Sequence, residues 1–222
     1  EKRLSGLAWK VIRLMKKQFS IIILSFFITF VAHAETFRVG KTRTITKIQQ
    51  AINLAKNGDT VLVDAGLYKE KNIVIQKSIT LIGINYPVLD GEKKYAIVSI
   101  KAENAKIEGF KIQHTGRSEI KDLGAIMIYD SYKVSAVNNI LEDNNFGVYI
   151  QNSKSCTIKN NTITAYGKNE FQSGNGIHGW HSDSLIIVGN KIKGHRDGLY
   201  FEFVKNTLVW RNISTQNIRY GI

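Results

Sequence analysis

Apolar and polar residues alternate over short stretches along most of this chain. Apolar residues recur two positions apart, as in Ile126-x-Ile128, Val148-x-Ile150 and Leu199-x-Phe201. This spacing of two is typical of β-strands that bury one face. Asparagine and glycine residues separate the strands, and both residue types suit sharp turns. The pattern therefore predicts an all-β protein made of many short strands.

The strands belong to an internal repeat whose copies align in one register. Its clearest marker is an asparagine at intervals of 22, 29 and 22 residues: Asn139, Asn161, Asn190 and Asn212. A repeat of this length is typical of a solenoid, whose units bury a face only by stacking. We therefore predict a right-handed parallel β-helix over residues 35–222. The asparagines are predicted to be structural, since asparagine tolerates a left-handed corner and stacked amides hydrogen-bond from coil to coil.

A short amphipathic helix is predicted ahead of the repeat, because apolar residues keep helical spacing between positions 48 and 55. Thr46 and Gln49 fit a capping box at its start, and Gly58 fits the residue just after its end. Such a helix covers the open apolar end of the first coil, as solenoids require. At the other end the chain stops at Ile222, one residue pair into the next strand. We therefore expect a β-helix that is truncated at its C-terminus.

The first 34 residues have the pattern of an export signal. Residues 1–14 precede the first methionine, Met15, and are expected to be upstream, non-native translation. Residues 15–34 are interpreted as a signal peptide, with a basic start, an apolar run and a small-x-small cleavage site that ends at Ala34. The alternative, a membrane anchor, needs a longer apolar run. We therefore predict a periplasmic mature chain, residues 35–222, without a membrane span.

Charge and cysteine content narrow the function classes. Subtracting the six Lys/Arg and one Glu of residues 1–34 from the 31 Lys/Arg and 18 Asp/Glu of the whole chain leaves 25 and 17, a net charge of +8. A basic exported protein can meet an anionic polysaccharide, a membrane surface or an acidic protein; alternatively, the charge is a solvated surface. No nucleic-acid-binding motif is visible, so no nucleic acid is expected as a partner. Cys156 is the only cysteine, which excludes an internal disulfide, and we expect it to be buried.

Alternation along the strands places two columns of side chains on one outer face. The first column is Met127, Tyr149, His178 and Tyr200, and the second is Tyr129, Gln151, Trp180 and Glu202. Contiguous exposed aromatic residues usually mark a binding surface, so the three tyrosines and Trp180 are predicted to contact a partner. The alternative is that an insertion or a partner covers these residues for stability.

Three chemistries suit such a face. Aromatic rings beside acids and amides suit carbohydrate stacking, and aromatic surfaces also suit protein interfaces. Thioether and imidazole groups suit copper, Cu(I) above all, and a metal at His178 would draw its other ligands from neighbouring coils, from Met127 or Glu202. His178 and His181 are three positions apart on a strand, so we expect them to face opposite sides.

No catalytic constellation is visible, so the chain is not expected to be an enzyme. Acid–base cleavage of a polysaccharide needs clustered acids, or a base with an arginine, on one face. The acids on the aligned strands are sparse, since Asp130 and Glu202 lie in different columns, and no pair has the spacing that glycoside hydrolysis needs. At the corner before Gly198, Arg196 and Asp197 are expected to pair with each other or to cap a turn.

Three stretches near the C-terminus carry a resemblance to a known family. They are residues 174–180 (Gly-Asn-Gly-Ile-His-Gly-Trp), 195–203 (His-Arg-Asp-Gly-Leu-Tyr-Phe-Glu-Phe) and 217–221 (Asn-Ile-Arg-Tyr-Gly). The chain, from about Thr36 to its last residue, resembles the NosD family, the periplasmic β-helix proteins of nitrous oxide reductase maturation. That family belongs to the broader carbohydrate-binding and sugar-hydrolase-like (CASH) repeat group, which is similar to pectin lyases.

The resemblance implies a copper-related role in the periplasm. Members of the family work with an ABC transporter, made of an ATPase and a permease, and with a copper-chaperone lipoprotein to assemble the copper–sulfur centre of nitrous oxide reductase. We therefore expect an accessory protein that binds a partner or copper transiently on its outer face and needs no cofactor to fold. The alternative function is a carbohydrate-binding or carbohydrate-active β-helix of the lyase or hydrolase kind.

Overall fold

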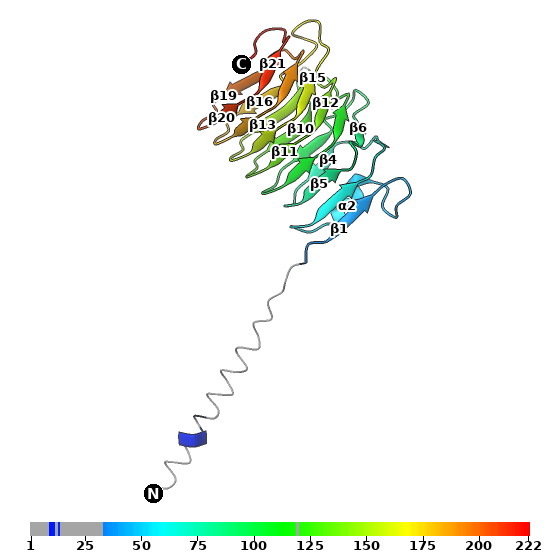
Figure 1. Cartoon of the computed structure of the whole chain (residues 1–222), viewed down its shortest axis with the longest axis vertical. Coiled ribbons are helices and arrows are strands. Elements are labelled where there is room, and N and C mark those ends of the chain that lie inside the picture. The colour runs from blue at the N-terminus through cyan, green and yellow to red at the C-terminus, as the bar shows by residue number, and fades with distance from the viewer. Residues whose placement is uncertain (1–8, 12, 14–32, 119) are drawn as a thin grey trace. The chain divides into compact units, whose positions relative to one another are not determined.

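The computed structural model describes residues 9–11, 13, 33–118 and 120–222. The predictions for residues 1–14 and for most of the signal peptide fall outside the described residues and stay predictions. Residues 34–222 form one structural unit, which contains all the labelled elements of Figure 1. Within the described residues, no helix has the length and apolar character that crossing a membrane requires.

The unit is a parallel β-helix, because each coil of the chain contributes one short strand to each of three parallel sheets. Sheet A holds β1 (Thr36–Val39), β2 (Thr60–Val63), β5 (Thr80–Gly83), β8 (Lys106–Glu108), β11 (Ser135–Val137), β14 (Thr157–Lys159), β17 (Ile186–Val188) and β20 (Leu208–Trp210). Sheet B holds β3 (Leu67–Tyr68), β6 (Val88–Asp90), β9 (Lys111–Gln113), β12 (Ile140–Glu142), β15 (Thr162–Thr164), β18 (Lys191–Lys193) and β21 (Ile213–Thr215). Sheet C holds β4 (Ile73–Ile75), β7 (Val98–Ile100), β10 (Gly124–Tyr129), β13 (Phe146–Gln151), β16 (Ile177–Trp180) and β19 (Leu199–Glu202). The strands stack as successive coils (Figure 1).

The core lies inside the coils and follows from the alternation in the sequence. In sheet A the inward column is Val61, Leu81, Ile107, Ala136, Ile158 and Ile187, all fully buried. Neighbouring strands are about 4.8 Å apart, so equivalent side chains of successive coils lie in contact. Cys156 is also fully buried at a corner, as expected, and this burial raises the pKa of its thiol. The predicted parallel β-helix is therefore confirmed.

The four repeat asparagines form a hydrogen-bonded column at the corner between sheets A and B. Asn161 is typical of them: its Oδ1 accepts hydrogen bonds from the backbone N of Asn139 at 2.9 Å and from Nδ2 of Asn139 at 3.1 Å. Its Nδ2 donates to the carbonyl oxygen of Ala136 at 2.9 Å. Asn190 and Asn212 repeat this pattern in the following coils. The column therefore satisfies the buried backbone N–H groups of the corner residues, which lie outside the strands.

We expected the column asparagines to adopt the left-handed backbone conformation at this corner, and this expectation is wrong. The residue before each of them adopts it instead. These residues are Asn138, Asn160, Gly189 and Arg211, with φ of 55°, 56°, 68° and 52°. The turn at the preceding residue leaves the column asparagine free to point inward. The sharp corner and the amide column are thus produced by neighbouring positions.

The predicted N-terminal helix is present as α2 (Ile48–Leu54), and its residues Ile48, Ala51 and Ile52 are buried against the first coils. The predicted capping box is wrong, because the N-cap residue is Lys47 and it makes no side-chain capping bond. Instead, the Glu70 carboxylate accepts hydrogen bonds from the backbone N of Ile48 at 2.7 Å and of Gln49 at 3.0 Å. A distant acid thus caps the helix and ties it to the solenoid.

The end of α2 also differs from the prediction. Its C-cap is Ala55, so Gly58, with a φ of 93°, lies beyond the helix end. The Lys77 ammonium group donates hydrogen bonds to the carbonyl oxygens of Ile52, Asn53 and Ala55 at 3.1, 2.9 and 2.6 Å. A cation at the C-terminus of a helix satisfies its free carbonyl groups and its dipole. At both ends of α2, contacts with residues distant in sequence therefore replace the predicted local capping residues.

Candidate functional site

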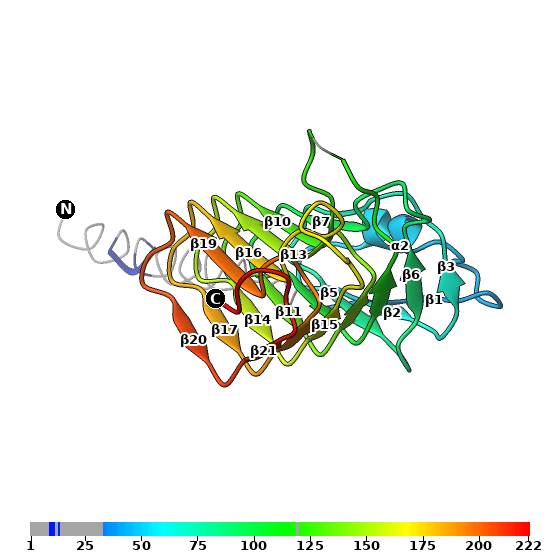
Figure 2. The ribbon, with the colours of Figure 1, turned by 90° about the horizontal axis from the view of Figure 1, so that it is seen from above.

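Two long loops leave the solenoid at the corner between sheets B and C. The connection between β12 and β13 is only residues 143–145, whereas residues 114–123 join β9 to β10 and residues 165–176 join β15 to β16. We call them the first loop and the second loop. Because the coils are in register, both project from the same corner, on either side of the short connection (Figure 2). They bring residues from outside the strands to the edge of sheet C.

The first predicted column on the outer face of sheet C is aligned as expected. Met127, Tyr149, His178 and Tyr200 are register partners in successive strands. The Tyr149 and His178 rings are stacked, with centroids 4.7 Å apart and planes inclined by 11°, and His178 and Tyr200 follow at 5.2 Å and 31°. The spacing of the rings is close to the spacing of the coils, so the backbone itself sets the stack.

The second predicted column runs beside the first. Tyr129, Gln151, Trp180 and Glu202 are aligned in the same strands. Tyr129 contacts Tyr149 of the first column, with ring centroids 6.2 Å apart. Tyr129, Gln151 and Trp180 are half-buried, and Glu202 is exposed. This column therefore combines rings, an amide and a carboxylate on an accessible surface.

The expectation that the whole face is open to water is wrong for Met127 and Tyr149, which are 0% and 6% exposed. They form a second apolar cluster with Phe146, outside the core of the coils. The second loop covers Phe146, since a side-chain carbon on Gly174 would lie 2.9 Å from the Phe146 ring. The alternative of a covering insertion therefore holds for these two residues, and the open part of the face begins at His178.

The first loop brings the Asp122 carboxylate near Tyr149. Burial raises the pKa of Tyr149, and the negative charge of Asp122 raises it further. Burial also raises the pKa of Tyr129, with a smaller contribution from the charge of Asp122. Both hydroxyls therefore stay protonated at neutral pH and act as hydrogen-bond donors.

His178 is held as a neutral hydrogen-bond donor at the centre of the face. Burial lowers its pKa to about 4, so the imidazole is neutral at pH 7. Its Nδ1 lies 2.9 Å from Nδ2 of Asn175, a buried residue of the second loop. With the amide donating to Nδ1, the ring proton is placed on Nε2. His178 thus offers an N–H group between the rings of Tyr149 and Tyr200.

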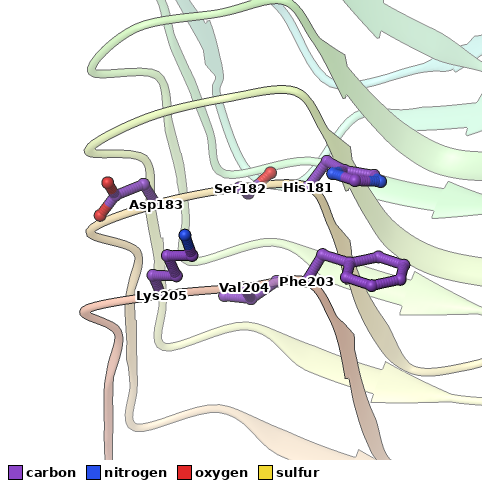
Figure 3. A pocket seen from close by; sticks show the side chains of 6 residues that line it. All are labelled: His181, Ser182, Asp183, Phe203, Val204 and Lys205. Atoms are coloured by element: carbon purple, nitrogen blue, oxygen red, sulfur yellow. The ribbon is translucent and has the colours of Figure 1, made fainter.

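The aromatic surface continues around the corner between sheets C and A. Trp180 meets His181 edge to face with ring centroids 4.2 Å apart, and His181 stacks on Phe203 at 4.6 Å and 19°. The stacked pair forms one side of a shallow depression of about 410 Å³. Figure 3 shows the residues that line it on two successive coils: His181, Ser182, Asp183, Phe203, Val204 and Lys205. Phe203 is 64% exposed.

The expectation that His178 and His181 face opposite sides is wrong. Strand alternation ends at Trp180, and His181 has a φ of 44°, which turns its side chain outward. Phe203, the equivalent residue of the next coil, has a φ of 54°. Left-handed corner residues therefore extend the outer face instead of entering the core.

The sequence of residues 43–192 and of residues 95–222 matches the profile of a family described as "Right handed beta helix region". The chain belongs to this family. Together with the parallel sheets, this match establishes the hand of the β-helix.

A curated relative of this β-helix is a cell surface glycoprotein of Methanothermus fervidus. It is 31% identical over 144 residues, which are 64% of this chain and 18% of the relative. The chain therefore spans less than a fifth of the length of that relative. The match is thus to one part of a larger protein.

Solved structures share the fold at low identity. A protein of Parabacteroides merdae, named as a candidate glycosyl hydrolase, has a TM-score of 0.61 at 14% identity, over 76% of this chain and 90% of that chain. Pectate lyase Pel9A has a TM-score of 0.57 at 14% identity, over 82% of this chain and 55% of that chain. At these identities the likeness concerns the architecture alone.

The structure does not bring the predicted copper ligands of this β-helix together. Met127 and His178 are two strands apart with Tyr149 between them, which separates them by roughly 10 Å. Met127 is also fully buried. Across residues 33–118 and 120–222, no three His, Cys, Asp or Glu side chains are arranged to hold a metal ion. His178, Met127 and Glu202 therefore do not fit a shared copper site.

The corner before Gly198 supports the second loop. Asp197 is fully buried and pairs with Arg219 at 2.7 Å and with Arg196 at 3.4 Å. His195 is also fully buried, and its Nδ1 lies 3.3 Å from the carbonyl oxygen of Gly174 in the second loop. Arg196 and Asp197 thus interact as expected, and His195 anchors the loop that orients His178.

Sequence reasoning missed the residues of the site that lie outside the strand columns, namely Asp122, Phe146 and Phe203. One signal was available for the second loop: the interval between Asn161 and Asn190 is 29 residues, against 22 for its neighbours. The excess of seven residues indicates an insertion in that coil. No local pattern indicates the surface that an insertion covers.

Proposed function

We propose that this chain is an extracytoplasmic carbohydrate-binding β-helix that holds a saccharide against the outer face of sheet C. The observation that carries the proposal is the continuous surface of accessible rings from His178 and Tyr200, past Trp180, to His181 and Phe203. The surface is flanked by carboxylate, amide and hydroxyl groups. We call these five residues the aromatic band.

The chemistry of the aromatic band suits a sugar chain. A sugar ring has apolar C–H faces and a polar rim, so it is bound best by flat rings with hydrogen-bonding groups beside them. The aromatic band supplies the rings, while Gln151, Glu202 and the Nε2–H group of His178 supply acceptors and donors. The aromatic band lies on two successive coils, about 4.8 Å apart, and it continues from β16 and β19 into the following corner, so it suits a short oligosaccharide.

An extracytoplasmic location rests on two observations. The pattern of residues 15–34 is that of a cleaved export signal, and the curated relative is named as a cell surface glycoprotein. Because the identity to pectate lyase Pel9A is 14%, that likeness supports the architecture and not a lyase activity. The proposal is therefore for binding, and a catalytic role is not part of it.

Copper delivery to nitrous oxide reductase, with the transporter and lipoprotein partners, stays a prediction that rests on the resemblance to the NosD family. Its proposed ligands are separated in the structure, and one of them, Met127, is fully buried. Carbohydrate binding uses the residues that are accessible. It is therefore the function that the described geometry favours.

Replacing Trp180 by alanine is expected to weaken saccharide binding about 30-fold, because loss of a central aromatic contact typically costs about 2 kcal/mol. Phe203→Ala is expected to act in the same direction, since Phe203 is an exposed ring of the aromatic band. Binding is measured by isothermal titration with oligosaccharides of two to eight units derived from dextran, cellulose, alginate and polygalacturonate.

Trp210→Ala is the matched control. Trp210 is an exposed aromatic ring, as the rings at the open end of the aromatic band are, with 52% of its surface exposed. It lies on sheet A, outside the aromatic band, and stacks with Arg211. It is expected to leave binding unchanged. If the wild-type chain binds none of the oligosaccharides, or if Trp180→Ala binds as tightly as Trp210→Ala, the proposed function is refuted.

A further inference from the structure

We infer that Lys93, Arg117 and Asp143 form a second saccharide site, at the corner between sheets B and C, which takes neighbouring hydroxyl groups of an uncharged sugar. This inference rests on the proposed function, which supplies the class of ligand. The site includes Arg117 of the first loop. We call it the corner site.

The corner site is a depression of about 220 Å³ lined by Lys93, Thr115, Arg117 and Asp143. The Lys93 ammonium group is 3.7 Å from Oδ2 of Asp143, and Nη2 of Arg117 is 3.9 Å from Oδ1. Nε2 of His114 is 3.9 Å from Oδ2. Hydrogen bonds of these groups require about 2.7–3.2 Å. Three polar groups therefore surround one carboxylate, and each stands too far away to bond to it directly.

The backbone and a second acid keep His114 apart from Asp143. His114 and Asp143 directly follow the aligned strands β9 and β12, and both have left-handed φ, 59° and 50°, which aims their side chains outward. Nδ1 of His114 lies 3.0 Å from Oδ2 of Asp90. Asp90 is itself fixed by hydrogen bonds from Gln113 and from the backbone of Glu92. His114 is thus held by Asp90 and does not close on Asp143.

Gaps of this size fit a bridging hydroxyl group. A water or an equivalent ligand oxygen that lies beside such a pair can hydrogen-bond to both of its members. A hydroxyl donates one hydrogen bond and accepts two, so it donates to the Asp143 carboxylate and accepts from Lys93 or Arg117. Two neighbouring hydroxyls of a sugar ring satisfy both cations at once.

The Asp143 carboxylate reduces the attraction of the corner site for anions. An isolated anion is attracted by Lys93 and Arg117 but repelled by Asp143, and a cation meets the opposite combination. A hydroxylic ligand without net charge uses all three groups without repulsion. The Lys93 and Arg117 side chains are 73% and 48% exposed, so a ligand can reach them, while Asp143 at 21% is held more firmly.

The first loop connects the corner site to the face of sheet C. Arg117 of this loop faces Asp143 at the corner, and the charge of Asp122 of the same loop acts on Tyr149 and on His178 of the aromatic band. The first loop therefore lies between the corner site and the edge of the aromatic band. A short oligosaccharide fits the aromatic band alone, whereas a longer one also reaches the corner site.

The test compares oligosaccharides of two and of eight units on the full chain by isothermal titration. Asp143→Ala and Arg117→Ala are expected to weaken binding of the uncharged octasaccharide about tenfold and to leave the disaccharide unchanged. Arg43→Ala is the matched control, because Arg43 forms an exposed pair with Asp64 at 2.7 Å beyond the ends of β1 and β2; it is expected to bind both lengths as the wild type does.

The outcomes separate this inference from the proposed function. If Trp180→Ala weakens binding but Asp143→Ala and Arg117→Ala bind both lengths like the wild type, the corner site is refuted and the aromatic band stands. Equal weakening of both lengths also refutes a separate site. If only alginate and polygalacturonate fragments are affected, and the effect vanishes in 0.5 M salt, the ligand is an anion and the inference is overturned. If the wild type binds no saccharide, both proposals fail.

Discussion

Asn161→Ala is expected to lower the free energy of unfolding by about 4 kcal/mol. The Asn161 side chain is buried, accepts two hydrogen bonds from Asn139 and donates to Ala136 and Asn190. Alanine leaves the backbone N–H of Asn139 buried without a partner, which costs about 1–3 kcal/mol, and it also removes the side-chain bonds to Ala136 and Asn190. The small cavity adds to this cost. Guanidinium denaturation followed by circular dichroism measures the change.

Asn53→Ala is the matched control for this experiment. Asn53 is an exposed residue of α2, where alanine suits the helix, and the free energy of unfolding is expected to change by less than about 0.5 kcal/mol. If Asn161→Ala is no more destabilising than Asn53→Ala, the asparagine column does not stabilise the solenoid. The buried apolar columns would then be what keeps the coils aligned.

The sequence was sufficient to predict the coils because the information is local and repeated. Alternation decides which residues face inward, and the asparagine interval decides which coils align, so the columns that begin at Met127 and Tyr129 were predicted with the correct partners. Each coil repeats the same physical constraint, since an error of one position would turn a whole strand inside out. Because the constraint is repeated in every coil, the register of a solenoid can be predicted from its sequence.

Accessibility was not predictable in the same way, because it depends on the two loops. Alternation correctly places Met127 and Tyr149 outside the coils, but Phe146 and the second loop then cover them. A loop carries no periodic signal, and its contacts are distant in sequence. The helix caps show the same effect, since Glu70 replaces the local capping box at α2.

The corner site was also beyond local reasoning. Lys93, Arg117 and Asp143 follow three different strands of sheet B and are 24 and 26 residues apart in sequence, and they match no motif. Of the two acids that alternation places near sheet C, only Glu202 lies in a strand, since Asp130 is itself a left-handed corner residue after β10, with φ of 44°. Corner residues with left-handed φ escape the strand alternation, and both His181 and Asp143 belong to this class. Aligning corners as well as strands would have brought these residues together.

The protein is expected to lose about 3 kcal/mol of stability between pH 6.5 and pH 4 through His195 alone. Burial lowers the pKa of His195 from its ordinary value of 6.5 to about 4 in the folded state. Below pH 6.5 the unfolded chain binds a proton that the folded chain rejects, so the free energy of unfolding falls as the pH falls. The loss is complete near pH 4, and about 2.5 pKa units correspond to about 3.4 kcal/mol.

His195→Gln tests the assignment, because glutamine keeps hydrogen-bonding groups but does not titrate. The variant is expected to be less stable at pH 7, yet its stability should fall by about 3 kcal/mol less than that of the wild type between pH 6.5 and pH 4. His181→Gln, which replaces an exposed histidine, is the control and should keep the wild-type dependence. Parallel curves for the wild type and His195→Gln would contradict the prediction.

Since His195 anchors Gly174 in the second loop, and Asn175 of that loop orients His178, acid should loosen the loop and weaken saccharide binding over the same pH range.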